Sequence, residues 1–199
     1  MSHMKTAATT VLIAAACAGA QAFCFSEAGE RYGVAPELLQ AIAKVESSLN
    51  PRAINDSHKA TTGSIDIGLM QINSSHLKRL STWGITQESL LKDPCLNVMV
   101  GAWLLVQHMA QHGQDWNGIG SYNASCTRLK GQACTDARNS YSWKVYRALS
   151  SAKAATPQRA AADQVVNTQG TRPSIKSVDL VEPQLLAQAV TNPRDETTR

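Results

Sequence analysis

The amino-acid sequence predicts a mainly helical domain over residues 23–150, with a short irregular β-hairpin or loop inside it. Two observations predict this fold class. Apolar side chains recur at intervals of three and four residues in several segments, which is the spacing of a buried helix face. Between these segments, residues 52–65 are polar and rich in turn formers. At 199 residues the chain accommodates one such domain with extensions at both ends.

The elements are expected in a definite order. A helix over residues 26–32 ends at Gly33, and a second begins at Pro36 and stops before Asn50-Pro51. The segment 65–73 is too short and glycine-interrupted for a helix, and it alternates too poorly for a strand. Two brief helices follow, over residues 74–80 and 86–91, and then a long buried helix over residues 95–113. A loop over residues 125–137 leads to a final amphipathic helix over residues 141–149.

The N-terminus, residues 1–22, has the features of a cleaved secretory signal. Lys5 supplies a positive charge, residues 11–18 form an apolar run, and Ala20-Gln-Ala22 matches a cleavage site before Phe23. A membrane anchor is excluded because about ten apolar residues cannot cross a bilayer core, which needs about 20. The mature chain is therefore expected in the periplasm, without a membrane span.

The cysteines support this location. Cys17 follows three alanines, as in a lipoprotein signal, but the usual leucine ahead of it is missing. If Cys17 leaves with the signal, four cysteines remain, an even number that favours disulfides in an exported protein. Three pairings are open; Cys126 and Cys134 are close enough in sequence to clip one loop, which leaves Cys24 for Cys95. A zinc site is disfavoured because no Cys-x-x-Cys occurs.

The composition of the chain limits which classes of binding partner are expected. The formal charge of +4 is too weak and dispersed to favour nucleic acid, although a mildly basic protein is attracted to an anionic polymer such as a bacterial wall. His108 and His112 lie one helical turn apart, but no third metal ligand accompanies them. We expect neither a metal nor a cofactor.

The last part of the chain differs from the rest. Over residues 151–199 alanine, glutamine, threonine and proline dominate and aromatic residues are absent, which predicts a flexible tail. Residues 184–190 could form a short helix on a partner, although a helix of this length is marginal alone.

Glu46 is the candidate for chemistry on the second helix. It shares a helix face with the apolar Leu39 and Ile42. A carboxyl among apolar neighbours loses solvation when it ionises, so its pKa should rise towards neutrality, as a general acid requires. The alternative interpretation is an ordinary surface glutamate in the last helical turn.

Three short motifs give this glutamate a context. Glu46-Ser47, Gly68-Leu-Met-Gln71 and Tyr122-Asn123 together resemble the signature motifs of the family-1 lytic transglycosylases. The chain is most similar to the small, single-domain members that serve conjugation and type III or IV secretion machines. These share Asp-Ile-Gly-Leu-Met-Gln-Ile-Asn, here residues 66–73, and the later Asp-Pro-Cys and Gly-Ala-Trp. The similarity covers residues 24–124, about half of the chain.

The resemblance implies a goose-type-lysozyme-like domain whose groove binds peptidoglycan glycan strands and which cleaves between N-acetylmuramic acid and N-acetylglucosamine. It assigns Glu46 as the acid that protonates the glycosidic oxygen while an oxocarbenium-like state develops. The resulting carboxylate then takes the proton of the sugar's own 6-hydroxyl, which closes a 1,6-anhydro ring without water. The implied substrate-binding residues are Ser47, Gly68, Met70, Gln71, Tyr122 and Asn123. Of these, the Gln71 amide can both donate to and accept from sugar groups, whereas the apolar Met70 suits the groove wall better.

Asp66 leaves the mechanism open. It could bring a second catalytic carboxylate to the groove, or it could be a loop aspartate bonded to backbone N–H groups. With Asp66 and Glu46 acting together, the protein would be a retaining muramidase that hydrolyses the same bond. The remaining alternative is a wall-binding assembly factor without activity. In each case the tail could tether the protein to a conjugation or secretion apparatus.

Overall fold

The computed structural model describes residues 23–155. The predicted signal over residues 1–22 and the predicted tail beyond residue 155 lie outside the described residues. The described part contains eight α-helices and one small antiparallel sheet, so the mainly helical fold class is confirmed. Among these residues, none of the helices combines the length and apolar character needed to span a bilayer.

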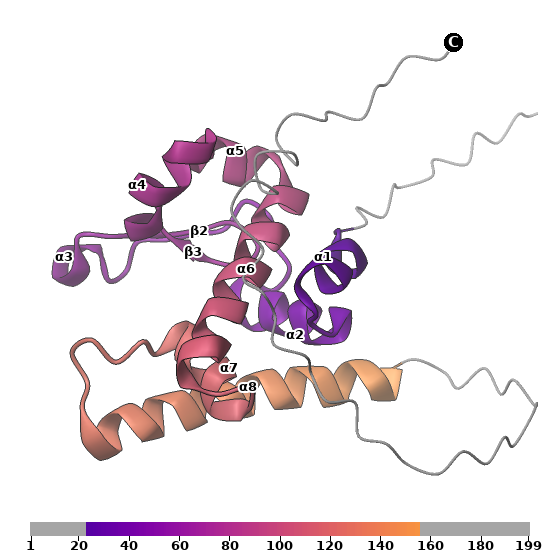
Figure 1. Cartoon of the computed structure of the whole chain (residues 1–199), viewed down its shortest axis with the longest axis vertical. Coiled ribbons are helices and arrows are strands. Elements are labelled where there is room, and N and C mark those ends of the chain that lie inside the picture. The colour runs from indigo at the N-terminus through magenta and orange to yellow at the C-terminus, as the bar shows by residue number, and fades with distance from the viewer. Residues whose placement is uncertain (1–22, 156–199) are drawn as a thin grey trace, which may run out of the picture.

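Helix α6, Pro94–His112, runs through the middle of the domain (Figure 1). Asp93 caps it, because its Oδ1 accepts a hydrogen bond of 3.0 Å from the Leu96 backbone N–H. Residues 96–105 are buried without a break, as expected for a helix that is apolar on nearly every face. The sequence predicted this helix to within one residue at each end.

Helices α1, Phe25–Tyr32, and α2, Pro36–Ser47, pack together, and α1 also packs against α6. Helix α2 ends earlier than the Asn50-Pro51 pair that was predicted to stop it. Ser48 and Leu49 both adopt left-handed backbone, with φ of 55° and 65°, and so turn the chain away. Glu46 consequently lies in the last turn of α2.

The sheet consists of three strands of two residues each, in the order β1-β2-β3: Ile54–Asn55, Asp66–Ile67 and Ile72–Asn73. Asp66 of the central strand pairs with Asn55 on one side and with Asn73 on the other. A short helix, α3, Lys59–Thr62, connects β1 to β2. The segment 65–73, which the periodicity assigned to neither helix nor strand, is thus a hairpin with very short strands.

Four short helical elements follow the sheet in the chain. They are η1 (Ser74–His76), α4 (Leu77–Leu80), η2 (Ser81–Trp83) and α5 (Gln87–Lys92). These agree with the two brief helices that were predicted for this region.

Helix α7, Trp116–Asn123, was not among the predicted helices, and it contains the Tyr122-Asn123 motif. Two glycines obscured this helix in the sequence, because glycine usually interrupts helices. Gly120 is required by packing: a Cβ there would lie 2.6 Å from the Arg138 carbonyl oxygen on α8. Tyr122 therefore lies in the last turn of a helix that packs closely on α8.

Helix α8, Gly131–Ala155, is much longer than the predicted 141–149 and begins inside the expected loop 125–137. Its first half has few apolar side chains, so the periodicity did not reveal it. Tertiary contacts stabilise this half instead: the buried Arg138 side chain donates from Nε to the Ala124 carbonyl oxygen at 3.1 Å. The helix also continues past residue 151, through the alanine-rich start of the predicted tail.

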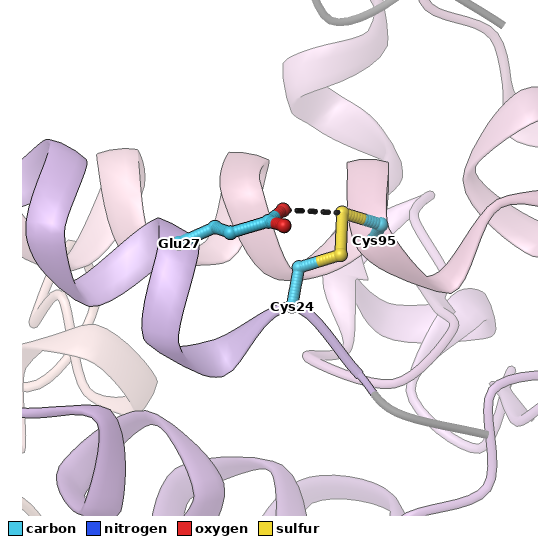
Figure 2. A group of neighbouring side chains, drawn as sticks. All are labelled: Cys24, Glu27 and Cys95. Carbon is cyan, nitrogen blue, oxygen red and sulfur yellow. Dashed lines mark hydrogen bonds between the residues drawn. A yellow bond between two sulfur atoms is a disulfide. The ribbon is translucent and has the colours of Figure 1, made fainter. Parts of the chain in front are cut away.

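Two disulfides form, Cys24–Cys95 and Cys126–Cys134, so of the three open pairings the one favoured by proximity is present. The first ties the N-terminal end of α1 to the start of α6. Figure 2 shows Glu27 beside this bond, with its Oε2 3.9 Å from Cys95 Sγ. Both sulfurs are already bonded to each other, so this group offers no thiolate to a metal.

Candidate active site

A groove of about 830 Å³ separates the sheet and α3 from α7, the following loop and α8. Five predicted site residues line it: Glu46, Asp66, Gln71, Tyr122 and Asn123. They come from α2, from the hairpin and from α7. The fold thus brings together the three motifs that the sequence singled out.

Glu46 is largely enclosed, and its carboxylate Oε1 accepts a hydrogen bond of 2.6 Å from the Tyr141 hydroxyl. Burial raises the pKa of Glu46 to about 7, and the negative charge of Asp66 adds to this rise. The hydrogen bond from Tyr141 and the positive charge of Lys144 act in the opposite direction. The carboxyl is therefore close to half protonated at neutral pH, which suits a proton donor.

Tyr141 also belongs to the site, although no sequence pattern identified it as functional. It is the first residue of the final amphipathic helix predicted over residues 141–149, and its side chain is only 4% exposed. Its hydroxyl nevertheless donates to Glu46. Burial raises the pKa of Tyr141 well above its usual value, and the negative charge of Glu46 raises it further. The phenol therefore stays a hydrogen-bond donor. Because 95 residues separate the pair, no local pattern could have revealed it.

Asp66 lies on the central strand with both carboxylate oxygens engaged. Asn73 Nδ2 donates to Oδ1 at 2.8 Å, Asn55 Nδ2 donates to Oδ2 at 3.4 Å, and His58 Nε2 lies 3.6 Å from Oδ2. The alternative prediction, that backbone N–H groups bind the Asp66 carboxylate, is wrong, because its partners are side chains. The same three side chains also line the groove.

The turn over residues 68–71 is built around Gly68 and the buried Asn97. Gly68 has a φ of +76°, and a Cβ there would lie 2.2 Å from Asn97 Nδ2. Asn97 accepts a hydrogen bond of 2.8 Å from the Met70 backbone N–H and donates one of 3.1 Å to the Ile67 carbonyl oxygen. No pattern in the sequence singled out Asn97, whose side chain fixes the backbone of this turn.

Two further hydrogen bonds, from side chains on α2 and α7, fix the backbone carbonyl groups of the same turn. Ser47 Oγ donates to the Leu69 carbonyl oxygen at 2.8 Å, and the Tyr122 hydroxyl donates to the Met70 carbonyl oxygen at 2.9 Å. Ser47 also donates to the Ala43 carbonyl oxygen at 3.1 Å, as an ordinary last-turn serine does. Both residues therefore position the turn relative to Glu46.

Gln71 and Met70 differ in what they offer the groove. Gln71 Nε2 donates within the turn, to the Gly68 carbonyl oxygen at 2.8 Å, while its side chain borders the groove. The Met70 side chain is fully buried, so it belongs to the core and is not positioned to touch a groove ligand.

The histidine pair of α6 makes contacts within the protein. His108 Nδ1 lies 3.3 Å from Ser121 Oγ, and His112 Nε2 lies 3.4 Å from Arg138 Nη2. Burial lowers the pKa of His108 to about 4, and the charges of His112, His76 and Arg138 lower it further. His108 is consequently a neutral ring at the groove wall, in a T-shaped arrangement with the Tyr122 ring at a centroid distance of 5.9 Å.

Comparison with known proteins adds the family context. Residues 23–142 match the family described as "Transglycosylase SLT domain". Invasion protein IagB of Salmonella typhimurium is 41% identical over 133 residues, which are 65% of this chain and 79% of that protein. Protein IpgF of Shigella flexneri is 40% identical over 127 residues, 64% of this chain and 79% of that protein. A "Peptidoglycan-binding-like protein" of Escherichia coli O157:H7 is 41% identical over 109 residues, 53% of this chain and 65% of that protein.

Proposed function

Because the chain belongs to the family of SLT transglycosylase domains, we propose that it is a peptidoglycan lytic transglycosylase. It cleaves the bond between N-acetylmuramic acid and N-acetylglucosamine and leaves a 1,6-anhydromuramic acid end. The observation that carries this proposal is the enclosed carboxyl of Glu46, with a pKa raised to about 7, in a groove shared with Asp66, Gln71 and Tyr122.

In the first step the protonated carboxyl of Glu46 transfers its proton to the glycosidic oxygen. The bond from that oxygen to C1 of the muramyl sugar breaks, the electron pair stays on the oxygen, and positive charge develops on the sugar. Tyr141 donates to Oε1, so the acidic proton lies on Oε2, the oxygen left for the substrate. The leaving N-acetylglucosamine departs with a restored 4-hydroxyl.

In the second step the 6-hydroxyl oxygen of the same muramyl sugar bonds to C1 and gives its proton to the Glu46 carboxylate. This closes the anhydro ring and regenerates the acid, with no water consumed. Burial favours this second transfer as well, because the carboxylate gains by taking up a proton again.

Asp66 is proposed as a second carboxylate that stabilises the positive charge on the sugar between the two steps. Its support is its position in the groove and its fixation by Asn55 and Asn73. The same arrangement favours the rival activity, a muramidase in which water attacks C1. Mass spectrometry of digested peptidoglycan separates them, since the transglycosylase leaves anhydro ends and the muramidase leaves reducing ends.

The experiment that tests activity itself compares three proteins on purified peptidoglycan: wild type, Glu46→Gln and Glu37→Gln. Glu37 is an exposed glutamate in the first turn of the same helix, so its variant controls for the loss of one carboxylate. We expect Glu46→Gln alone to abolish product formation. No product from any of the three would favour a wall-binding protein whose groove is not catalytic, and equal product from all three would exclude Glu46 as the acid.

The proposed place of action is the periplasm, with residues 1–22 as the signal peptide and residues 23–150 as the catalytic domain. The two disulfides support an oxidising compartment. Opening the wall locally for a conjugation or secretion apparatus is the proposed role, with residues 151–199 as the tether. A truncation should be placed after Ala155, where helix α8 ends. If that variant binds every apparatus component as well as the full chain does, the tether is refuted.

A further inference from the structure

The loop between α7 and α8 makes a direct contact across the groove. Arg128 Nη2 donates a hydrogen bond of 2.9 Å to the carbonyl oxygen of Thr61 on α3, which lies 67 residues earlier in the chain. Arg128 and Thr62 both line the groove that contains Glu46. Figure 1 shows α3 and this loop on the same side of the molecule. Arg128 therefore lies next to the path that a glycan strand bound in the groove would follow.

The charge of Arg128 is not balanced by an acid. It is the one lysine or arginine among the residues that line the groove. Within residues 23–155 its hydrogen-bond partner is a neutral carbonyl, and the ion pairs of this part of the chain involve other residues. A guanidinium has five N–H donors and binds carboxylates in a two-pronged geometry, so most of its donor capacity is unused.

The loop that carries Arg128 is anchored at both ends. The Cys126–Cys134 disulfide closes it over a separation of eight residues. At its start the buried Arg138 holds the Ala124 carbonyl oxygen at 3.1 Å, and Lys130 Nζ donates to the Cys126 carbonyl oxygen at 3.1 Å. The guanidinium is thus presented to the groove by a restrained segment, which lowers the ordering cost of binding a ligand.

We propose that Arg128 binds a carboxylate of the stem peptide on a muramyl sugar, so that the enzyme prefers peptide-bearing strands to bare glycan. This inference rests on the proposed function. The sugar rings offer hydroxyls and acetamido groups, which are neutral, whereas the stem peptide is the part of the substrate that carries free carboxylates. Leu129, 45% exposed and also in the groove wall, offers an apolar contact for the alanine methyl groups of such a peptide.

When the stem peptide binds, its carboxylate replaces the Thr61 carbonyl oxygen as the hydrogen-bond partner of Arg128. The contact with Thr61 is an exposed hydrogen bond to a neutral oxygen, so it contributes little. A carboxylate accepts two N–H groups at once and brings a charge of opposite sign. The contact with α3 orients the guanidinium before the ligand arrives.

The test measures affinity in the Glu46→Gln background, so that the ligand is not cleaved. Soluble glycan oligomers of one length are used in two forms, one with stem peptides and one stripped by an amidase. Calorimetry compares the parent with Arg128→Ala, Arg128→Lys and Arg147→Ala. Arg147 is a matched control, because it is an exposed arginine on helix α8 that does not line the groove.

We expect Arg128→Ala to weaken binding of the peptide-bearing oligomer about fivefold and to leave the stripped oligomer unchanged. Arg128→Lys should recover part of the loss, Arg147→Ala should behave as the parent, and the preference should shrink as salt is added. A parent without preference for peptide-bearing oligomers, or an Arg128→Ala variant that weakens both ligands equally or neither, overturns the proposal. Because binding is measured without turnover, this outcome is independent of whether the wild type makes anhydro ends.

Discussion

The Tyr141 hydroxyl donates a hydrogen bond of 2.6 Å to Oε1 of Glu46, across 95 residues of sequence. The bond joins the last turn of α2 to helix α8 and fixes one oxygen of an enclosed carboxyl. It also lowers the pKa of Glu46, while burial raises it more strongly. The tyrosine therefore both positions the acid and limits how far its pKa rises.

Replacing this tyrosine tests both effects. In Tyr141→Phe the pKa of Glu46 should rise, because a hydrogen bond that favours the ionised form is lost. Glu46 must be protonated to act as the acid, so the loss of activity at high pH should shift to higher pH. The rate at the optimum should fall about tenfold, because the carboxyl is no longer held in place. Tyr146→Phe, at an exposed tyrosine of the same helix, should leave the pH profile unchanged.

The raised pKa of Glu46 also predicts a pH dependence of stability. The pKa is about 7 in the folded state and 4.5 as the reference value, so the folded state holds this proton more tightly. Its stabilising contribution is complete below pH 4.5 and is lost as the pH rises through about 7, a change of about 3 kcal/mol. Glutamine at this position cannot ionise, so Glu46→Gln should gain stability relative to wild type by about that amount between pH 4 and pH 8.

Urea unfolding of the two proteins at both pH values measures this difference. Glu37→Gln, at an exposed position, should show no such gain with pH. Parallel stability profiles for wild type and Glu46→Gln would mean that the carboxyl is not perturbed.

Gly68→Ala should destabilise the protein by about 3 kcal/mol, because the new methyl group adds a steric conflict to an unfavourable backbone angle. The conflict is with Asn97 Nδ2, at 2.2 Å from the added Cβ. Gly63→Ala provides a matched control, since Gly63 has a φ of +73° and no atom within 4 Å of its added Cβ. This control should cost only about 1 kcal/mol. Equal losses of unfolding free energy in the two variants would show that Asn97 does not brace the turn.

Asp66→Asn tests the second carboxylate. The variant should lose about tenfold to a hundredfold in rate, because the charge that stabilises the sugar cation is gone, while its products should remain anhydro sugars. Asp56→Asn, at an exposed position beyond β1, should keep the wild-type rate. An unchanged rate for Asp66→Asn would assign Asp66 to the structure of the sheet alone.

The family and the main helices could be predicted from the sequence because their signals are local. Glu46-Ser47 and Gly68-Leu-Met-Gln71 are contiguous motifs, and the SLT family to which they pointed is confirmed. Helix α6 is apolar on nearly every face, so the burial of ten consecutive residues follows from its composition. The disulfide pairing favoured by the closeness of Cys126 and Cys134 is also present.

What the sequence did not reveal depends on contacts between distant segments. Tyr141 and Asn97 are bound to parts of the chain that folding alone brings to them. Helix α7 was not predicted because it contains two glycines, of which Gly120 is needed for close approach to α8, a requirement visible only in three dimensions. The first half of α8 was missed because the polar Arg138 stabilises it through hydrogen bonds, not through an apolar stripe.

The measurement that tests the central proposal most directly is mass spectrometry of the sugar ends released from purified peptidoglycan by wild type and by Glu46→Gln. A transglycosylase that uses Glu46 as its acid and base should give 1,6-anhydromuramic acid ends with the wild type and no released product with the variant. Reducing ends from the wild type, or anhydro ends that persist in Glu46→Gln, would contradict it.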